Sequence, residues 1–123
     1  MFLVTGLALA FRNFAVFSGR ASRGEYWSFA AALGVVFFLL MLFGSVVRDF
    51  LILALVLSVL AGIPEISIAV RRLHDTGRSG WFLLLYLIPG IGSIIVFILM
   101  LLPGERGANS YGPPRLPLGQ LAN

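Results

Sequence analysis

The sequence predicts an all-α membrane protein: a polytopic helical bundle of three transmembrane helices with a short N-terminal amphipathic helix at the interface. Hydrophobic residues make up 59% of the 123 residues and charged residues only 11%. The mean hydropathy is +1.00. A soluble domain is about half apolar and about a quarter charged, so lipid is expected to surround much of this surface. Residues 1–123 are expected to form a single membrane domain.

The composition also excludes several kinds of site. The chain has no cysteine and one histidine, which excludes disulfides and thiol chemistry and argues against a zinc site. No metal and no cofactor are expected. All nine basic residues are arginines, and they flank apolar runs. This pattern is typical of membrane topology and anionic headgroups, and no nucleic-acid partner is expected.

The first two predicted helices differ in length. Residues 7–17 carry apolar side chains at helical spacing but are too few to cross a bilayer, so they are predicted to form an interfacial amphipathic helix. A short helix packed on the bundle is the alternative. Residues 26–47 are uncharged over 22 positions, and a span needs roughly 20. They form the clearest predicted transmembrane helix.

The second apolar stretch, residues 50–70, contains Pro64 and Glu65. Proline suits the first position of a helix, and an acid suits the positive end of the helix dipole. The stretch is therefore predicted to be a second transmembrane segment that is broken into two pieces near Gly62. Membrane helices tolerate such breaks where neighbouring groups satisfy the freed backbone.

The third apolar stretch, residues 81–102, carries Pro89–Gly90 near its middle. A kinked span is the first interpretation, and a re-entrant hairpin that turns at Pro89–Gly90 is the alternative. Residues 103–123 are rich in glycine and proline and are predicted to form an extended, irregular tail.

The arginine distribution predicts the orientation. With three spans, six arginines lie before the first span or in the 71–80 loop, and three lie in the first turn or the tail. This bias places the N-terminus and the 71–80 loop in the cytoplasm. A re-entrant third segment brings the tail to the same side and makes the division eight to one.

The first polar motif is GRASRGEYW at residues 19–27. Ser22 and Glu25 have the S-x-x-E spacing of a capping box, in which each side chain accepts a hydrogen bond from a free amide at the helix start. Arg20 and Arg23 are candidates for binding headgroup phosphates or a partner. A helix cap with interfacial anchors is the simpler interpretation.

The second polar motif is RRLHDTGRSGW at residues 71–81. Three of its residues are further candidates for binding lipid or a partner: Arg71, Arg72 and Arg78. Ser79 is expected to cap the following helix. His74 and Asp75 suggest a carboxylate-oriented imidazole, but neighbouring residues on a helix do not face each other. No catalytic residue is therefore predicted.

Glu65 is the polar outlier of the second apolar stretch. It lies six residues before Arg71, about 9 Å of helix rise inside the segment. A carboxylate at that depth is expected to be paired, protonated or turned toward a wet cavity. It is grouped with His74 and Asp75 as a candidate functional polar cluster, and a helix start at Pro64 is the structural alternative.

The motifs and their order resemble one bacterial family. The chain reads FSGRASRGEYW, an apolar run, RRLHDTGRSGWF, LIPGIG and PGERGANSYGP. It is identified on these motifs as a member of the domain of unknown function 805 (DUF 805) family over roughly residues 11–114. The resemblance implies a small inner-membrane protein with several helices, and it supplies no substrate.

The sequence favours a non-enzymatic function. The first hypothesis is a structural or interaction subunit that binds anionic lipid, or a protein partner or second copy, through the arginine-rich loop. The second is a component of a small-solute or ion transporter or channel that uses Glu65 and the broken helices. A headgroup enzyme with His74 as base is a third, but no nucleophile or metal site accompanies it.

Overall fold

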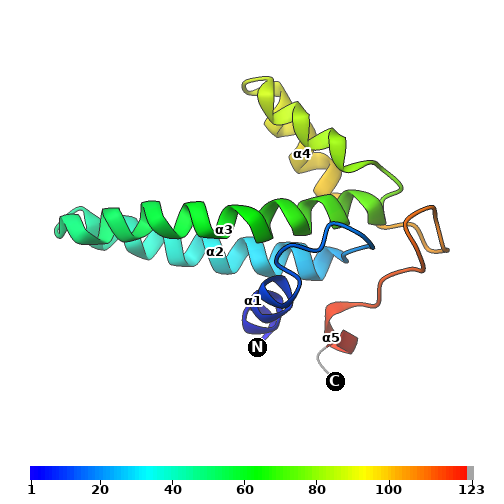
Figure 1. Ribbon diagram of the computed structural model, residues 1–123, viewed down its shortest axis with the longest axis horizontal. Helices are drawn as coiled ribbons and strands as arrows, with labels where there is room; N and C mark the ends of the chain where they lie inside the picture. Colours follow the sequence, from blue (N-terminus) through cyan, green and yellow to red (C-terminus); the bar gives the residue numbers. More distant parts are fainter. Residues whose placement is uncertain (122–123) are drawn as a thin grey trace.

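A computed structural model describes residues 1–121, and within that range the regular secondary structure is helical, with one isolated β-bridge between Asn109 and Gly112. The elements in order are α1 (Phe2–Arg12), α2 (Arg23–Gly44), α3 (Arg48–Asp75), the 3₁₀ helix η1 (Gly80–Leu87), α4 (Ile91–Leu101) and α5 (Leu118–Leu121) (Figure 1). The predicted all-α class is confirmed.

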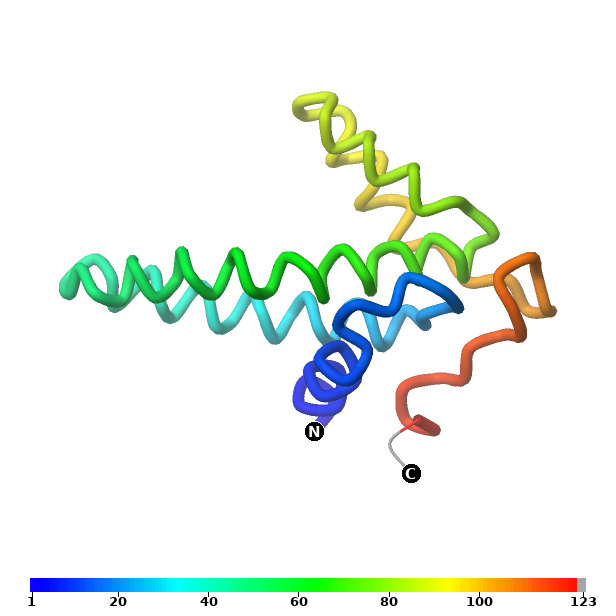
Figure 2. The backbone as a smooth tube through the Cα atoms, viewed as in Figure 1, coloured from blue at the N-terminus to red at the C-terminus, as the bar shows by residue number. Residues whose placement is uncertain are grey.

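Helices α2 and α3 form a long antiparallel hairpin (Figures 1 and 2). With 22 and 28 residues, they are about 33 Å and 42 Å long, and both are long and apolar enough to cross a membrane. Large apolar side chains on both helices are exposed, among them Phe38, Leu55 and Val59. Such a surface fits a hydrocarbon environment and not water.

Helix α2 begins three residues earlier than predicted because its first turn is capped. The Ser22 hydroxyl accepts from the Glu25 amide at 3.2 Å, and the Glu25 carboxylate accepts from the Ser22 amide at 2.9 Å. This is the capping box that the S-x-x-E spacing predicted. The helix ends at Gly44, and residues 45–47 turn the chain into α3.

The predicted break in the second segment is wrong, because α3 is one continuous helix that includes Pro64 (Figure 1). Proline removes one backbone hydrogen bond, but Pro64 is buried, and the surrounding packing holds the helix on both sides of it. Helix α3 also runs past residue 70 to Asp75. The arginine-rich motif is therefore partly helical, and His74 lies in the last helical turn rather than in a loop.

The third apolar stretch is a helical hairpin, so the kinked-span interpretation is wrong and the re-entrant alternative describes the backbone. Its arms are η1, with 8 residues, and α4, with 11, each about 16 Å long. That is about half of a ~30 Å hydrocarbon core. The arms meet closely at Gly92, where a Cβ atom would lie 1.6 Å from the Leu85 carbonyl oxygen.

Both ends of this hairpin lie beside the C-terminal end of α3. Gly80, the first residue of η1, packs directly on Val70, and the Arg72 guanidinium donates to the Leu102 carbonyl just after α4. The arms leave α3 at an angle and return to the same end (Figure 1). Residues that follow Leu102 therefore start at the end of the molecule where α3 finishes.

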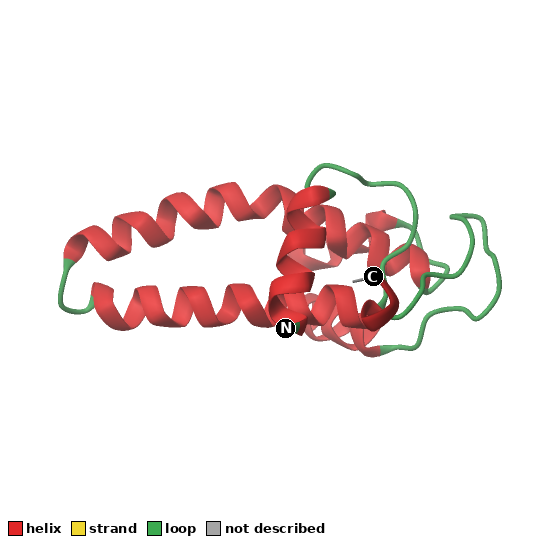
Figure 3. Ribbon diagram, turned by 90° about the horizontal axis from the view of Figure 1, so that it is seen from below, coloured by secondary structure: helices red, strands yellow, loops and turns green. Residues whose placement is uncertain are grey.

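Helix α1 crosses the α2–α3 hairpin transversely (Figure 3). It spans Phe2–Arg12 instead of the predicted residues 7–17. Gly6 allows close contact with Ser28, and the rings of Phe11 and Phe29 meet edge to face at 6.5 Å. A helix across a membrane hairpin has the direction expected of an interfacial helix, although it is also packed on the bundle.

The core lies at the end that carries both described termini. One buried group joins α1, the residue 13–22 segment, α2 and α3, and the other joins α3 to α4; together they contain Ala10, Ala21, Phe29, Ile68, Ala69, Leu73, Val96 and Met100. The far half of the long hairpin is mostly exposed. The protein is thus compact at one end and exposes apolar side chains at the other.

The tail is irregular over residues 103–117, as predicted, but it is not extended away from the bundle. It turns back along the end of α3 and α2 (Figure 2), and Leu118 of α5 packs against Gly24. Residues 122–123 of the predicted tail lie outside the described range. The folded-back tail places polar groups from distant parts of the sequence side by side.

Candidate functional site

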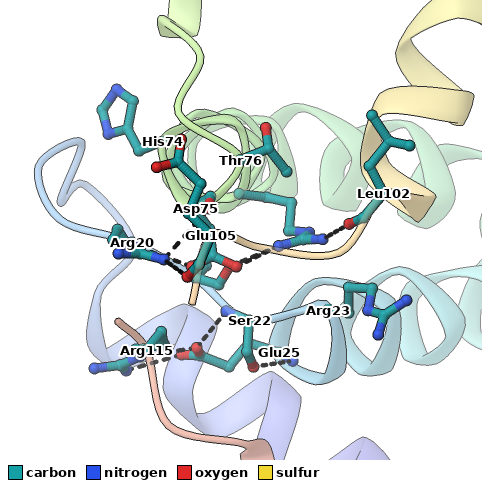
Figure 4. Close-up of polar contacts among 12 residues, drawn as sticks. Arg20, Ser22, Arg23, Glu25, His74, Asp75, Thr76, Leu102, Glu105 and Arg115 are labelled. Carbon is teal, nitrogen blue, oxygen red and sulfur yellow. Dashed lines mark hydrogen bonds and ion pairs between the residues drawn. The ribbon is translucent and has the colours of Figure 1, made fainter. Parts of the chain in front are cut away.

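A buried charged cluster surrounds Asp75, the last residue of α3. The Asp75 carboxylate accepts from Arg20 Nε at 2.8 Å and from an Arg72 terminal nitrogen at 2.5 Å. The Arg20 and Arg72 side chains are 1% and 0% exposed. We call these three residues the Asp75 cluster (Figure 4). Charged groups this buried are stable only when paired and hydrogen-bonded.

Arg20 also ties the tail to the bundle. Its terminal nitrogens donate to the carbonyl oxygens of Gly107 at 2.8 Å and Gly112 at 3.3 Å, and to that of Glu105. The Glu105 amide in turn donates to the Asp75 carbonyl at 2.8 Å. The Arg20 guanidinium therefore holds the turn between residues 105 and 112 against the end of α3.

Arg72 ties the re-entrant hairpin to the bundle in the same way. Its donors reach the carbonyl oxygens of Met100 at 3.4 Å and Ala21 at 3.4 Å, and that of Leu102. These contacts join α3 to the end of α4 and to the segment before α2. Because their donors face protein oxygens, Arg20 and Arg72 are not presented to lipid headgroups, although both were candidates from the sequence.

A second ion pair lies beside the α2 cap. Arg115 binds Glu25 with two parallel hydrogen bonds of 2.9 Å each, while Glu25 also accepts from the Ser22 amide. This bidentate geometry is the strong form of an arginine–carboxylate contact, and it raises the pKa of Arg115 further above its ordinary value. Arg115 was not predicted, because no local pattern links it to a residue 90 positions away.

His74 and Asp75 do not act as a pair. The histidine points away from the carboxylate (Figure 4): its Nδ1 lies 3.0 Å from the Gly19 carbonyl oxygen, and its ring stacks on Tyr111 at 3.9 Å with an interplanar angle of 4°. The Asn109 side chain donates to the His74 carbonyl at 2.9 Å. The imidazole therefore supports the tail, and the Asp75 carboxylate does not orient it.

Glu65 lies apart from the Asp75 cluster. It precedes Asp75 by ten residues on α3, about 15 Å along the helix. It lines a cavity of about 360 Å³ together with Tyr26 and Tyr86. Within residues 1–121 its carboxylate has no ion-pair or hydrogen-bond partner. The side chains of Glu65, His74 and Asp75 therefore lie in three separate environments and do not form the cluster that the sequence suggested.

Comparison with known proteins identifies the family. Residues 14–113 match the family described as "Protein of unknown function (DUF805)". The chain belongs to the DUF805 family. Two similar relatives come from Escherichia coli (strain K12). Inner membrane protein YhaI is 36% identical over 104 residues, which cover 82% of this chain and 86% of YhaI. Inner membrane protein YhaH is 37% identical over 111 residues, covering 85% of this chain and 92% of YhaH.

These matches place this DUF805 protein in the inner membrane, as the sequence predicted. No solved structure matches the chain. The matched residues 14–113 include the whole Asp75 cluster, the His74–Tyr111 stack and Glu65, while Arg115 lies just beyond them.

The remaining arginines of this DUF805 protein differ in accessibility. Arg71 is 4% exposed, and its Nε is the buried side-chain atom without a hydrogen-bond partner within residues 1–121. Five others pair with no carboxylate in the described range, and each is at least partly accessible: Arg12, Arg23, Arg48, Arg78 and Arg106. Arg78 and Arg23 donate one hydrogen bond each to a backbone carbonyl, which leaves most of their donors free.

Arg23 also lines a cavity of about 500 Å³ beside the start of α2. Arg115, Asp75 and Glu105 line the same cavity. Two of these three side chains are committed to internal ion pairs. Across residues 1–121 no group of three or more acids or histidines is placed to hold a metal ion. The groups that remain free at this end are thus chiefly guanidinium groups.

The Ser79 side chain accepts from the Trp81 amide at 3.3 Å, so Ser79 caps η1, the helix that it was expected to cap. The capping residues hold the starts of α2 and η1, and the Asp75 cluster and the Glu25–Arg115 pair join the segments that meet at the end of α3. Their chemistry is that of a structural lock, and the free arginines around them form the surface available to other molecules.

Proposed function

We propose that this DUF805 protein is a non-enzymatic inner-membrane subunit that binds anionic phospholipid headgroups through the arginines at its compact end. The observation that supports the proposal is the one-sided charge. The re-entrant hairpin brings the tail to the end where α3 finishes, so eight of nine arginines lie at that end and one, Arg48, lies at the opposite turn. The positive-inside rule places the compact end in the cytoplasm.

The charge available to lipid comes from the arginines that no carboxylate neutralises. The two acids of the Asp75 cluster and the α2 cap are paired internally, so they do not offset Arg12, Arg23, Arg78 or Arg106. A basic residue near an anionic membrane surface contributes about 1 kcal/mol of attraction. Four such residues supply enough electrostatic attraction to retain anionic lipid in preference to zwitterionic lipid.

The test is the lipid that accompanies the purified protein. The wild type and a variant with arginine-to-glutamine changes at positions 12, 23, 78 and 106 are purified from membranes in mild detergent, and bound lipids are counted by native mass spectrometry. We expect the variant to retain several-fold less phosphatidylglycerol and cardiolipin, with phosphatidylethanolamine unchanged.

Two controls separate charge from folding. The same four positions changed to lysine should keep the anionic lipid, because the charge is preserved. Arg48→Gln, at the opposite turn, should leave the lipid unchanged. Equal anionic lipid in the wild type and the glutamine variant contradicts the proposal. A protein recovered with the wild type and lost with the glutamine variant, without a change in lipid, favours a protein partner or second copy instead.

A transporter or channel component is the second candidate, supported by Glu65 at membrane depth beside a re-entrant hairpin. The continuity of α3 removes one of the two broken helices on which this idea rested. Flux of ions or small solutes into liposomes that contain the wild type, and its loss in Glu65→Gln, would support it. Equal flux in both proteins and in empty liposomes would exclude Glu65 as part of a pathway.

A further inference from the structure

Glu65 lies in an open groove between α2, α3 and η1, which we call the Glu65 wedge. Two cavities meet there, of about 270 Å³ and 360 Å³, and Glu65 and Tyr26 line both. The smaller continues along α2 past Phe37, and the larger continues along η1 past Leu84 and Tyr86. Apart from the carboxylate and the two phenols, the walls are apolar.

Among residues 1–121 the carboxylate finds no partner, although apolar side chains surround it in a membrane segment. An ionised acid at membrane depth is costly unless it is paired or hydrated, and such residues usually face a partner or a functional cavity. The Glu65 side chain is exposed to the wedge and not enclosed by the fold. A partner can therefore reach it from outside.

The chain does not supply the missing positive charge. Arg72 is about 10 Å farther along α3, buried and bound to Asp75. Arg48 lies 17 residues away, about 26 Å along the helix. The other arginines gather at the compact end, and the chain has no lysine. A second copy in the same orientation therefore brings no cation to the depth of Glu65.

The tyrosines indicate the chemistry of the absent partner. Aromatic faces attract organic cations, and the attraction increases when the site is desolvated. Within residues 1–121 neither the Tyr26 hydroxyl nor the Tyr86 hydroxyl makes a hydrogen bond to the protein, so both are free to contact a ligand. Ile66 and Leu83 add apolar wall to the same cavity.

We propose that the Glu65 wedge binds an amphipathic organic cation, a protonated amine or quaternary ammonium group with an apolar body, which enters from the lipid side. The ammonium group lies against the Glu65 carboxylate and the faces of Tyr26 and Tyr86, and the apolar body lies along η1. No arginine takes part, so the proposal for this site and the proposal for the headgroup site at the compact end can be tested independently.

The experiment measures equilibrium binding of radiolabelled dodecyltrimethylammonium to the full chain in nanodiscs of digalactosyldiacylglycerol, a neutral lipid that carries neither an amine nor a quaternary ammonium group. Empty nanodiscs give the background of simple partitioning. We expect saturable binding to the wild type at one site per chain. Glu65→Gln should weaken it by roughly tenfold or more, the scale for losing a desolvated charge contact, and Tyr86→Leu by roughly three- to tenfold, the scale for one aromatic face.

Matched controls test charge and position. Glu65→Asp keeps the carboxylate and should retain binding to within about threefold. Asp49→Asn removes an exposed acid at the far turn and should change nothing. Unlabelled dodecyldimethylamine oxide, which has the same alkyl chain and no net charge at pH 8, should compete poorly.

Three results overturn the proposal. The first is the absence of saturable binding above empty nanodiscs. The second is equal binding by the wild type and Glu65→Gln. The third is competition by the amine oxide as effective as competition by the unlabelled cation. Competition by phosphatidylethanolamine in the nanodisc, at equal sensitivity to Glu65→Gln, would identify a lipid amine as the cation and would leave the site as proposed.

Discussion

Two of the three carboxylates on helix α3 are in opposite situations. Asp75, at its end, accepts from two buried guanidinium groups. Glu65, ten residues earlier, faces a wedge with no partner from residues 1–121. The comparison separates two uses of a charge in a membrane protein: a paired charge determines how segments join, while an unpaired charge points to a molecule outside the fold. The variants below test that separation.

Asp75→Asn should have the largest effect on stability. It leaves Arg20 and Arg72 buried without a counter-charge, which costs about 3–5 kcal/mol. The measurement is unfolding in mixed micelles of mild detergent and dodecyl sulfate, followed by tryptophan fluorescence. Asp49→Asn, an exposed acid in the first turn of the same helix, should cost less than about 1 kcal/mol. Equal losses in the two variants would show that the Asp75 cluster does not hold the fold.

Gly104→Ala should disturb the same cluster from the tail side. A Cβ atom at this position would lie 2.0 Å from an Asp75 carboxylate oxygen, so the carboxylate must move away from its arginines. A loss of about 1–3 kcal/mol is expected, the range for overpacked sites. Gly119→Ala, where a Cβ meets nothing within 4 Å, is the control. An unchanged unfolding midpoint for Gly104→Ala would show that the tail does not press on Asp75.

Ser22→Ala removes the α2 cap and should cost about 1 kcal/mol, the usual value for an N-cap. The cost should exceed that of Ser79→Ala, because Ser22 belongs to a reciprocal box that also positions Glu25 for Arg115, whereas Ser79 caps a short 3₁₀ helix. The same mixed-micelle unfolding compares the two. A larger cost for Ser79→Ala would show that the reciprocal capping box does not make the α2 cap the stronger of the two.

Glu65→Gln should have the smallest effect on stability, within about 0.5 kcal/mol, as expected of changes that break no internal contact. Its effect should instead appear in ligand binding. The contrast with Asp75→Asn is sharpest when both variants are measured in the same micelles. A loss for Glu65→Gln approaching that of Asp75→Asn would mean that Glu65 has a structural partner, and it would remove the reason for a ligand there.

Local patterns in the sequence were enough to predict part of this structure. Composition predicted the all-α membrane class, the uncharged run of residues 26–47 predicted α2, and the S-x-x-E spacing predicted its cap. Each of these depends on residues close together in the chain. The turn at Pro89–Gly90 was recognised as an alternative, but local sequence could not choose between a kink and a hairpin, because the choice depends on contacts with α3.

The errors came from interactions between distant residues. Pro64 weakens a helix locally, yet packing from neighbouring segments keeps α3 continuous. Arg20 and Arg72 were assigned to lipid because each stands beside an apolar run. Their partners include Gly107 and Met100, which are 87 and 28 residues away, and no local pattern connects them. Arg115 was missed for the same reason.

The one-sided arrangement of charge also bears on how the chain enters the membrane. The turn of residues 45–47, together with Arg48 and Asp49 at the start of α3, forms the far end of the long hairpin. In the orientation that we propose, insertion from the cytoplasm carries only this short turn across the bilayer, with one arginine and one acid whose charges cancel. In that orientation the re-entrant hairpin starts and ends on the near side, so neither it nor residues 103–121 add a charged segment that must cross.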